Sequence, residues 1–462
     1  MMLSNGCQIS RRFRFIAVLL SFVAAILSFS GPAAAQLRID ITRGKVEPMP
    51  IAITEFQAQT PDDGRFGKDI SGVISADLER SGLFRPVDPK AFIDPKPPLG
   101  APPRFADWRV INAQAMVHGQ VRTLPDGQLQ VDFRLWDVLA GQQMEGASMT
   151  GTPAQGIWRK LAHRISDAIY KRITGEDGYF DTRIVYIAET GPLTRRIKRL
   201  ATMDQDGANH QFLTDGSSLA LTPRFSPSQQ EITFLSYHNN TPRVYIYNMQ
   251  TGRQEVLGDF PGMTFAPRFS PDGNGVIMSM AKDGNSEIFS MDLRTRRVTQ
   301  LTTNSFIDTA PSYSPDGRRI AFESDRGGTQ QIYVMDANGG NVERISFGHL
   351  KDGVWQGRYA TPVWSPRGDL IAFTKQYQGN FYIGVMRPDG KGERQLAQGF
   401  LVEGPTWAPN GRVLMFFKQD RSDARGGGGR TRVYSVDLTG YNEREVVTPL
   451  DASDPAWSPL NP

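Results

Sequence analysis

The sequence of 462 residues is poor in cysteine and histidine, the residues most often used for nucleophilic catalysis and metal binding. Its single cysteine, Cys7, lies in an N-terminal segment with the features of an export signal. We therefore expect no disulfide, catalytic thiol or thiolate metal site in the rest of the chain. Beyond that segment there is no run of 18 or more apolar residues, which argues against a second membrane-spanning helix.

The histidines do not form a catalytic or metal-binding pattern. They are His118, His163, His210, His238 and His349. No H-E-x-x-H or similar spacing occurs, so we expect each at the surface or in a loop, and no bound metal. The sequence also has no G-x-S-x-G nucleophile elbow, which argues against a serine hydrolase.

The first 35 residues have the pattern of a cleaved secretory signal. Arg11, Arg12 and Arg14 precede an apolar run over residues 15–29, and a helix-breaking Ser-Gly-Pro and three alanines follow. We predict cleavage between Ala35 and Gln36 by the general secretion route. An N-terminal membrane anchor is the alternative, but the apolar run is short for a bilayer.

Removal of the signal changes the charge balance of the chain. The formal charge of +4 includes three signal arginines, so 49 basic and 48 acidic residues remain and the charge becomes +1. The sequence pI of about 9.0 is thus a weak argument for binding nucleic acid or membrane. We expect an exported protein that binds no nucleic acid and does not insert into a membrane.

A short phrase occurs six times in the second part of the chain. It reads PRFSP, PRFSPDG, PSYSPDG, PVWSPRG, PTWAPNG and PAWSP, beginning at Pro223, Pro267, Pro311, Pro362, Pro405 and Pro455. The intervals are 44, 44, 51, 43 and 50 residues, a period typical of stacked or circular repeats. Each unit contains four short strand patterns, which predicts one propeller blade per repeat.

The ends of the repeat region predict how the propeller closes. Three strand patterns, over residues 183–189, 197–204 and 210–213, precede the first phrase, and a single strand at 456–458 follows the last complete unit. One blade built from both termini gives an all-β six-bladed propeller over residues 177–462, without an open edge.

Residues 36–176 predict a smaller α+β domain. Strand patterns and a hairpin turn over residues 124–127 alternate with helical spacing at 70–78 and 157–173. At its start, Leu37, Ile39 and Ile41 alternate with charged residues, which predicts a free strand that can pair with its own domain or with another protein.

The loops that lead into the aromatic strands are the most variable parts of the repeats. They carry apolar and aromatic residues, which favours either a protein-binding face or packing between neighbouring loops. Loop carboxylates and carbonyl oxygens could also converge on the axis, so a channel cation remains an alternative to having no cofactor.

Further motifs connect these parts to a known family. They are residues 72–78 (GVISADL), 81–84 (SGLF), 119–121 (GQV), 183–186 (RIVY) and 455–459 (PAWSP). Their order resembles the TolB family, periplasmic propeller components of the Tol-Pal system of Gram-negative bacteria, over nearly the whole exported chain.

The resemblance implies a non-enzymatic, monomeric periplasmic adaptor that supports outer-membrane integrity and constriction at division. It implies contacts to the peptidoglycan-associated lipoprotein Pal through Met263, Thr264, Phe265, Ala266, Asp308 and Thr309. It implies contacts to TolA through Gln36, Leu37, Arg38, Ile39, Asp40 and Ile41. The alternative is a periplasmic propeller enzyme or ligand-binding protein acting on peptides or saccharides.

Overall fold

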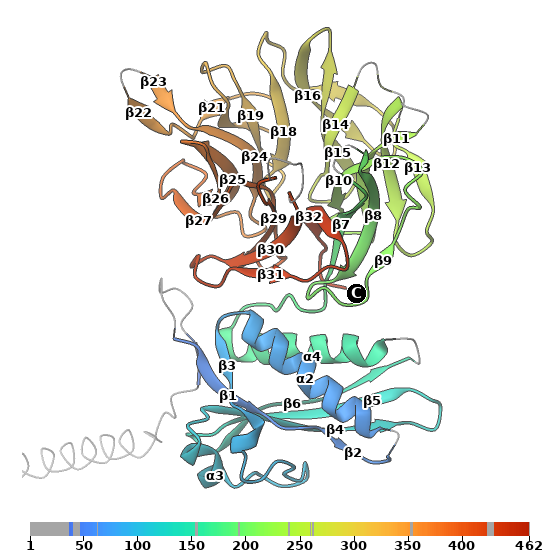
Figure 1. Ribbon diagram of the computed structural model, residues 1–462, viewed down its shortest axis with the longest axis vertical. Coiled ribbons are helices and arrows are strands. Elements are labelled where there is room, and N and C mark those ends of the chain that lie inside the picture. The colour runs from blue at the N-terminus through green and yellow to red at the C-terminus, as the bar shows by residue number, and fades with distance from the viewer. Residues whose placement is uncertain are drawn as a thin grey trace, which may run out of the picture.

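The computed structural model describes residues 37–39, 47–61, 63–152, 156–192, 195–238, 241–258, 260, 263–351, 354–422 and 429–461. Two domains follow one another along the chain and pack together (Figure 1). The predicted cleavage site, Ala35 and Gln36, lies outside the described residues, as do Asp40 and Ile41. No helix within the described ranges is both long enough and apolar enough to cross a bilayer.

The N-terminal domain is a six-stranded mixed sheet with helices on both faces (Figure 1). Its strands are β1 (Met49–Ile53), β2 (Gln57–Ala58), β3 (Phe84–Pro86), β4 (Ala115–Thr123), β5 (Leu129–Asp137) and β6 (Gln142–Gly151). They run in the order β3-β1-β4-β5-β6, with β2 beside β4; the pairs of β1 with β3 and β4 are parallel. The helices are α2 (Gly64–Arg80), α3 (Phe105–Val110), α4 (Ile157–Thr174) and the 3-10 turn η1 (Pro89–Ala91).

The long helices α2 and α4 lie between the sheet and the propeller (Figure 1). Apolar residues recur every four positions along α4, and they face the domain core because side chains at this spacing share one side of a helix. The helix ends at Gly175, whose φ of 80° is the left-handed conformation common after a helix. The short helix α3 was not predicted; its Trp108 packs on the opposite face of the sheet, near Trp136.

The second domain is the predicted six-bladed propeller. Five blades are continuous in sequence. They comprise β10 (Ala220–Phe225), β11 (Glu231–His238), β12 (Thr241–Asn248) and β13 (Gln254–Val256); β14 (Met263–Phe269), β15 (Gly275–Lys282), β16 (Asn285–Asp292) and β17 (Val298–Gln300); β18 (Asp308–Tyr313), β19 (Arg319–Ser324), β20 (Gln331–Asp336) and β21 (Glu343–Arg344); β24 (Arg358–Trp364), β25 (Ile371–Tyr377), β26 (Asn380–Met386) and β27 (Arg394–Gly399); and β28 (Leu401–Trp407), β29 (Val413–Gln419), β30 (Thr431–Asp437) and β31 (Arg444–Val446). A hairpin of β22 (His349–Lys351) and β23 (Val354–Gln356) lies in the 51-residue interval between phrases.

The sixth blade joins the two ends of the repeat region, as predicted. Its strands are β32 (Asp451–Trp457), β7 (Arg183–Thr190), β8 (Ile197–Asp204) and β9 (Gln211–Phe212). The pairing of β32 with β7 includes Ala456 opposite Val185 and Trp457 opposite Ile184. The final copy of the phrase therefore closes the ring.

The residues just before each phrase belong to strands, which corrects the prediction that they form loops. Residues 263–266, 308–309, 358–361 and 401–404 begin the innermost strands of four blades. The pairing of each of these strands with the next strand shifts in register where the phrase begins, and the residue before the first proline of the phrase has a positive φ. The six residues with this conformation are Thr222, Ala266, Ala310, Thr361, Gly404 and Asp454. A β-bulge changes the direction of the side chains that follow it, and here one lies in the innermost strand of every blade, where the phrase begins.

Candidate binding sites

The residues predicted to contact Pal lie on two neighbouring inner strands, β14 and β18. Met263 begins β14; Thr264 is buried, whereas Phe265 and Ala266 are half-buried. Thr309, on β18, is half-buried. Because of these differences in exposure, Phe265, Ala266 and Thr309 are better placed than Thr264 to meet another protein.

The side chain of Asp308 does not face solvent, and the residue forms hydrogen bonds within the propeller. Its side chain is fully buried, and one carboxylate oxygen accepts hydrogen bonds from Arg326 at 2.7 Å and from Asn304 at 2.8 Å. Its main-chain carbonyl accepts a bond from Ser286 of the preceding blade at 3.2 Å. Asp308 therefore positions the loop beside it, where residues 306 and 307 are exposed.

Four exposed apolar side chains lie on the connections that lead into inner strands. Their exposed fractions are 42% for Phe306, 47% for Ile307, 48% for Phe347 and 45% for Phe400. The backbone below the first two is fixed: the Phe306 N–H donates to Asn304 Oδ1 at 2.8 Å and the Ile307 N–H to Asp325 Oδ1 at 2.9 Å. Large apolar side chains held outward by an ordered backbone are typical of a protein-binding surface.

The described part of the N-terminal segment is docked on its own domain, which differs from the predicted free strand. Ile39 is buried, and its N–H donates to the carbonyl oxygen of Ile173, at the end of α4, at 3.2 Å. Leu37 packs against the same core, whereas Arg38 is exposed and passes over Gly175. Residues 37–39 form no strand and contact the C-terminal end of α4.

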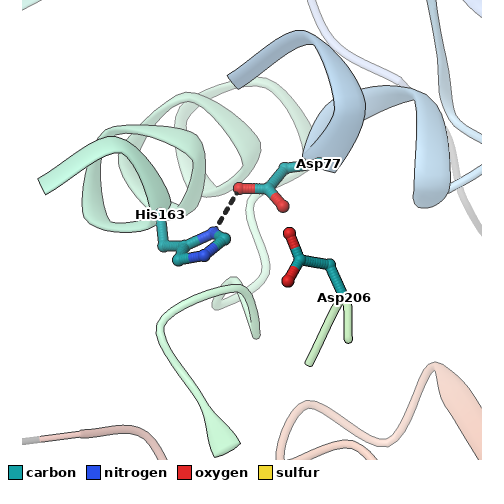
Figure 2. Close-up of side chains that lie close together, drawn as sticks. All are labelled: Asp77, His163 and Asp206. Carbon is teal, nitrogen blue, oxygen red and sulfur yellow. Dashed lines mark hydrogen bonds and ion pairs between the residues drawn. The ribbon is translucent and has the colours of Figure 1, made fainter. Parts of the chain in front are cut away.

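A buried polar cluster joins α2, α4 and the turn after β8, and sequence analysis did not predict it (Figure 2). His163 Nδ1 lies 2.7 Å from Asp77 Oδ2, and Gln205 Nε2 donates to the other oxygen of Asp77 at 2.9 Å. On the propeller side, Arg159 Nε donates to Asp204 Oδ2 at 3.2 Å, and its Nη2 bonds Asp206. The cluster therefore ties both helices of the first domain to the sixth blade.

Two cationic side chains offset part of the negative charge of the three aspartates in this cluster. Burial would lower the pKa of His163, but the carboxylates of Asp77, Asp206 and Asp204 outweigh it and raise that pKa to about 9. Ligand-type atoms of Asp77, His163 and Asp206 lie within 4.8 Å of one another, as in a metal site. Arg159 already pairs with Asp204 and Asp206, and the raised pKa of His163 opposes the loss of the proton that metal binding requires. The arrangement favours a domain-linking ion-pair network.

The linker between the domains contacts turns of the repeated phrase. In this linker, residues 175–181, the Glu176 carboxylate accepts hydrogen bonds from Arg367 at 2.7 Å and from Arg412 at 2.6 Å. Arg367 belongs to the fourth copy of the phrase, and Arg412 directly follows the fifth. Burial opposes ionisation of Glu176, but the two arginines lower its pKa overall. The turns of the fourth and fifth phrases therefore contact the linker and help to position the N-terminal domain.

Three carboxylates on the propeller strands β19, β28 and β32 are partly or fully buried: Glu323 is buried, and Glu403 and Asp454 are half-buried. Burial raises the pKa of Glu323 to about 7 and also raises the pKa values of Glu403 and Asp454, whose charges act on one another. The Thr361 N–H donates to Glu323 at 3.2 Å. Oxygen ligands of this kind would suit a hard cation.

Two histidines are buried, which corrects their predicted surface positions. His163 belongs to the polar cluster, and His118 accepts the indole N–H of Trp136 at 3.0 Å. Burial lowers the pKa of His118, consistent with a neutral ring that can accept. No spacing in the sequence could reveal either partner, because they come together only through packing.

Family models match both parts of the chain. A model described as the TolB beta propeller domain matches residues 170–461, and one described as the TolB amino-terminal domain matches residues 37–144. A curated relative, the Tol-Pal system protein TolB of Paramagnetospirillum magneticum (strain ATCC 700264 / AMB-1), is 62% identical over 451 residues. That match covers 98% of this chain and 99% of the relative.

Solved structures agree with the two-domain architecture. The crystal structure of TolB from Acinetobacter baumannii has a TM-score of 0.74 and 29% identity, covering 92% of this chain and 100% of that one. Hydrazine synthase of Kuenenia stuttgartiensis has a TM-score of 0.50 at 15% identity, covering 67% of this chain and 50% of that one. The second likeness concerns the fold alone.

Proposed function

This chain belongs to the TolB family of the Tol-Pal system, and on that premise we propose that it is a non-enzymatic periplasmic adaptor between Pal and TolA. Pal binds the propeller face that carries residues 263–266 and 306–309, and TolA binds the N-terminal segment at residues 36–41. The adaptor thereby supports outer-membrane integrity and constriction during division. The cleaved signal, residues 1–35, directs it to the periplasm.

The observation that carries the Pal-binding proposal is the set of exposed apolar side chains held on a fixed backbone. Phe306 and Ile307 directly precede β18, whose Thr309 is half-buried, and the half-buried Phe265 lies on the neighbouring inner strand β14. Burying such side chains against a partner removes apolar surface from water without ordering a mobile loop. A rigid apolar face therefore favours binding of a folded protein.

Introducing a charge on this face is expected to weaken Pal binding without unfolding the propeller. Phe306→Asp places a carboxylate in an interface that would otherwise exclude water, so we expect the Kd for purified Pal to rise about 30-fold. Phe265→Asp, on β14, is expected to weaken binding at least as much. Isothermal titration calorimetry measures both values, and circular dichroism checks the fold.

Val110→Asp is the matched control, because Val110 is 78% exposed on α3, in the other domain. It is expected to leave the Kd for Pal within twofold of the unaltered protein. Unchanged Pal affinity in both phenylalanine variants would place the Pal site elsewhere.

The docked N-terminal segment supports the TolA proposal. Ile39 makes one backbone hydrogen bond to Ile173, so release of the segment would expose one large buried side chain and few polar groups. The described part of the segment, residues 37–39, thus has few contacts, and a segment held in this way can exchange between its own domain and a partner at modest free-energy cost. Binding of Pal could bias that exchange only through different affinities for the docked and released states.

Deletion of residues 36–41 is expected to abolish binding of a purified TolA fragment while leaving the Kd for Pal within about threefold, because the two sites lie on different domains. Surface plasmon resonance with each partner measures the two affinities. Loss of both interactions would contradict separate sites.

A substitution outside the segment tests whether docking competes with TolA. A Cβ on Gly175 would lie 2.6 Å from Arg38 Nη2, and the φ of 80° there disfavours other residues. The exposed Arg38 side chain can move away, but the backbone strain falls on the end of α4, beside the carbonyl group that holds Ile39, so Gly175→Ala is expected to loosen the segment without changing its sequence. We expect Gly175→Ala to bind TolA as tightly as the unaltered chain or more tightly, whereas the deletion is expected to abolish TolA binding.

We propose no cofactor for the adaptor. Among the described residues, Glu323, Glu403 and Asp454 do not form a group whose oxygens lie close enough together to hold one ion.

A further inference from the structure

A cavity of about 380 Å³ lies on the propeller axis at the end where the repeated phrases turn. It is lined by the phrases of all six blades, including their prolines and aromatic residues. The residue directly after the first proline of each phrase contributes to this lining in every blade. The six residues at that position are Arg224, Arg268, Ser312, Val363, Thr406 and Ala456.

Two adjacent blades place arginines at this equivalent position. Arg224 is on β10 and Arg268 is on β14, and these inner strands contact each other. Both side chains are half-buried, as expected for groups that line a cavity. The ring is therefore positively charged on one side and uncharged on the other.

The arginines lack matching carboxylates within the described part of the chain. No described Asp or Glu lines the cavity, and no ion pair joins either guanidinium to a described carboxylate. Arg224 donates to the carbonyl oxygen of Pro223 at 2.6 Å and feels the charge of Asp454 at longer range. The guanidinium of Arg268 makes no hydrogen bond to a described residue, and its charged neighbour is Arg224.

This arrangement is unfavourable without a ligand. Burial lowers the pKa of Arg224, and burial together with the charge of Arg224 lowers the pKa of Arg268. Arginine nevertheless remains protonated in proteins, so two like charges stay together in a partly dehydrated space. Two guanidinium groups facing one cavity match the geometry of an oxyanion, whose oxygens accept paired N–H donors.

We propose that the axial cavity binds an oxyanion, a carboxylate or phosphate group carried by a small molecule or a chain end, between Arg224 and Arg268. The prolines and aromatic rings around the arginines provide an apolar wall for the body of that ligand. This site lies at the opposite end of the inner strands from the face proposed for Pal. The proposal therefore does not depend on the proposed Pal site.

The test is calorimetric titration of the exported chain with inorganic phosphate and, separately, with benzoate, at constant ionic strength set with sodium chloride. One of the two probes is expected to bind saturably at a single site and to raise the melting temperature. Binding of benzoate alone would assign a carboxylate on an apolar body, and binding of phosphate alone would assign a phosphate. Saturable binding of neither probe at millimolar concentration would overturn the proposal.

Arg268→Gln is expected to weaken the bound probe at least about tenfold, because it removes charge-assisted hydrogen bonds. Without ligand the variant should be at least as stable as the unaltered chain, because an unpaired charge has been removed. Arg268→Lys keeps the charge but loses the paired donors, so intermediate weakening is expected.

Arg318→Gln is the control, because Arg318 is exposed on the Pro315-Asp316-Gly317 turn, at the same end of the propeller, and does not line the cavity. Its Kd for the probe should stay within twofold of the unaltered value. Equal weakening by Arg318→Gln, or none by Arg268→Gln, would show that the probe binds outside the cavity.

Discussion

Trp457→Ala is expected to lower the free energy of unfolding by about 3–5 kcal/mol, the range typical of deleting a large buried side chain. Trp457 is 7% exposed, and its indole N–H donates to Thr182 at 2.8 Å. Its ring lies 5.8 Å from that of Tyr179 in the linker, which in turn packs edge-on against Tyr170 of α4. One side chain thus connects the closing strand, the linker and the N-terminal domain.

Urea denaturation followed by far-UV circular dichroism measures the loss of stability, and hydrogen exchange locates it. We expect faster exchange in β32 and β7, which the substitution loosens directly, and also in α4. If Trp457→Ala lowers the stability but leaves hydrogen exchange in α4 unchanged, Trp457 does not connect the propeller to the N-terminal domain.

Trp407→Ala is the matched control. Trp407 occupies the same position of the phrase in the preceding repeat, is 6% exposed and donates its indole N–H to Val363 at 3.0 Å. The hydrophobic cluster that contains Trp407 has residues of two propeller blades and none of the N-terminal domain. A similar loss of stability is therefore expected, with faster exchange confined to the propeller.

The repeat architecture was predictable because each blade encodes its own turns and its own buried strands. The proline, aromatic and glycine positions recur, so the blade number and the closure through residues 455–459 follow from local patterns. The amphipathic helix near residues 157–173 was predictable for the same reason. The six-residue α3 was missed because it is too short to show a period.

The sites depend on contacts that no local pattern contains. Asp77 meets His163 and Gln205 across separations of 86 and 128 residues, and their chemistry appears only after the two domains pack. Asp308 looked like a surface residue because it precedes a phrase, yet packing buries it. Arg224 and Arg268 did carry a signal, since they alone are charged at the position after the first proline, but only the closed ring brings that position to one cavity.

The interdomain cluster predicts a second large effect, a loss of stability at alkaline pH. The folded-state pKa of His163 is raised to about 9, above its ordinary value of 6.5. Its contribution is therefore complete below about pH 6.5 and is lost as pH rises through about 9. The shift corresponds to about 3 kcal/mol, of the order of a third of a typical domain stability.

His163→Gln separates this contribution from other titrations, because glutamine can still donate to Asp77 but cannot carry a proton charge. We expect the stability difference between the unaltered chain and the variant to shrink by about 2–3 kcal/mol between pH 7 and pH 10, because part of the full contribution is already lost at pH 7. Urea denaturation at each pH measures it. Burial raises the pKa of Glu323 to about 7 by a separate cause, so its titration affects both proteins equally and cancels.

His238→Gln provides the control, because His238 is exposed at the end of β11, far from the cluster in sequence and fold. Its stability difference from the unaltered chain should not change over the same pH range. A constant difference for His163→Gln as well would mean that the imidazole is neutral in the folded protein. The Asp77–His163 contact would then be an uncharged hydrogen bond, and Arg159 alone would hold the carboxylates of the sixth blade to the helices.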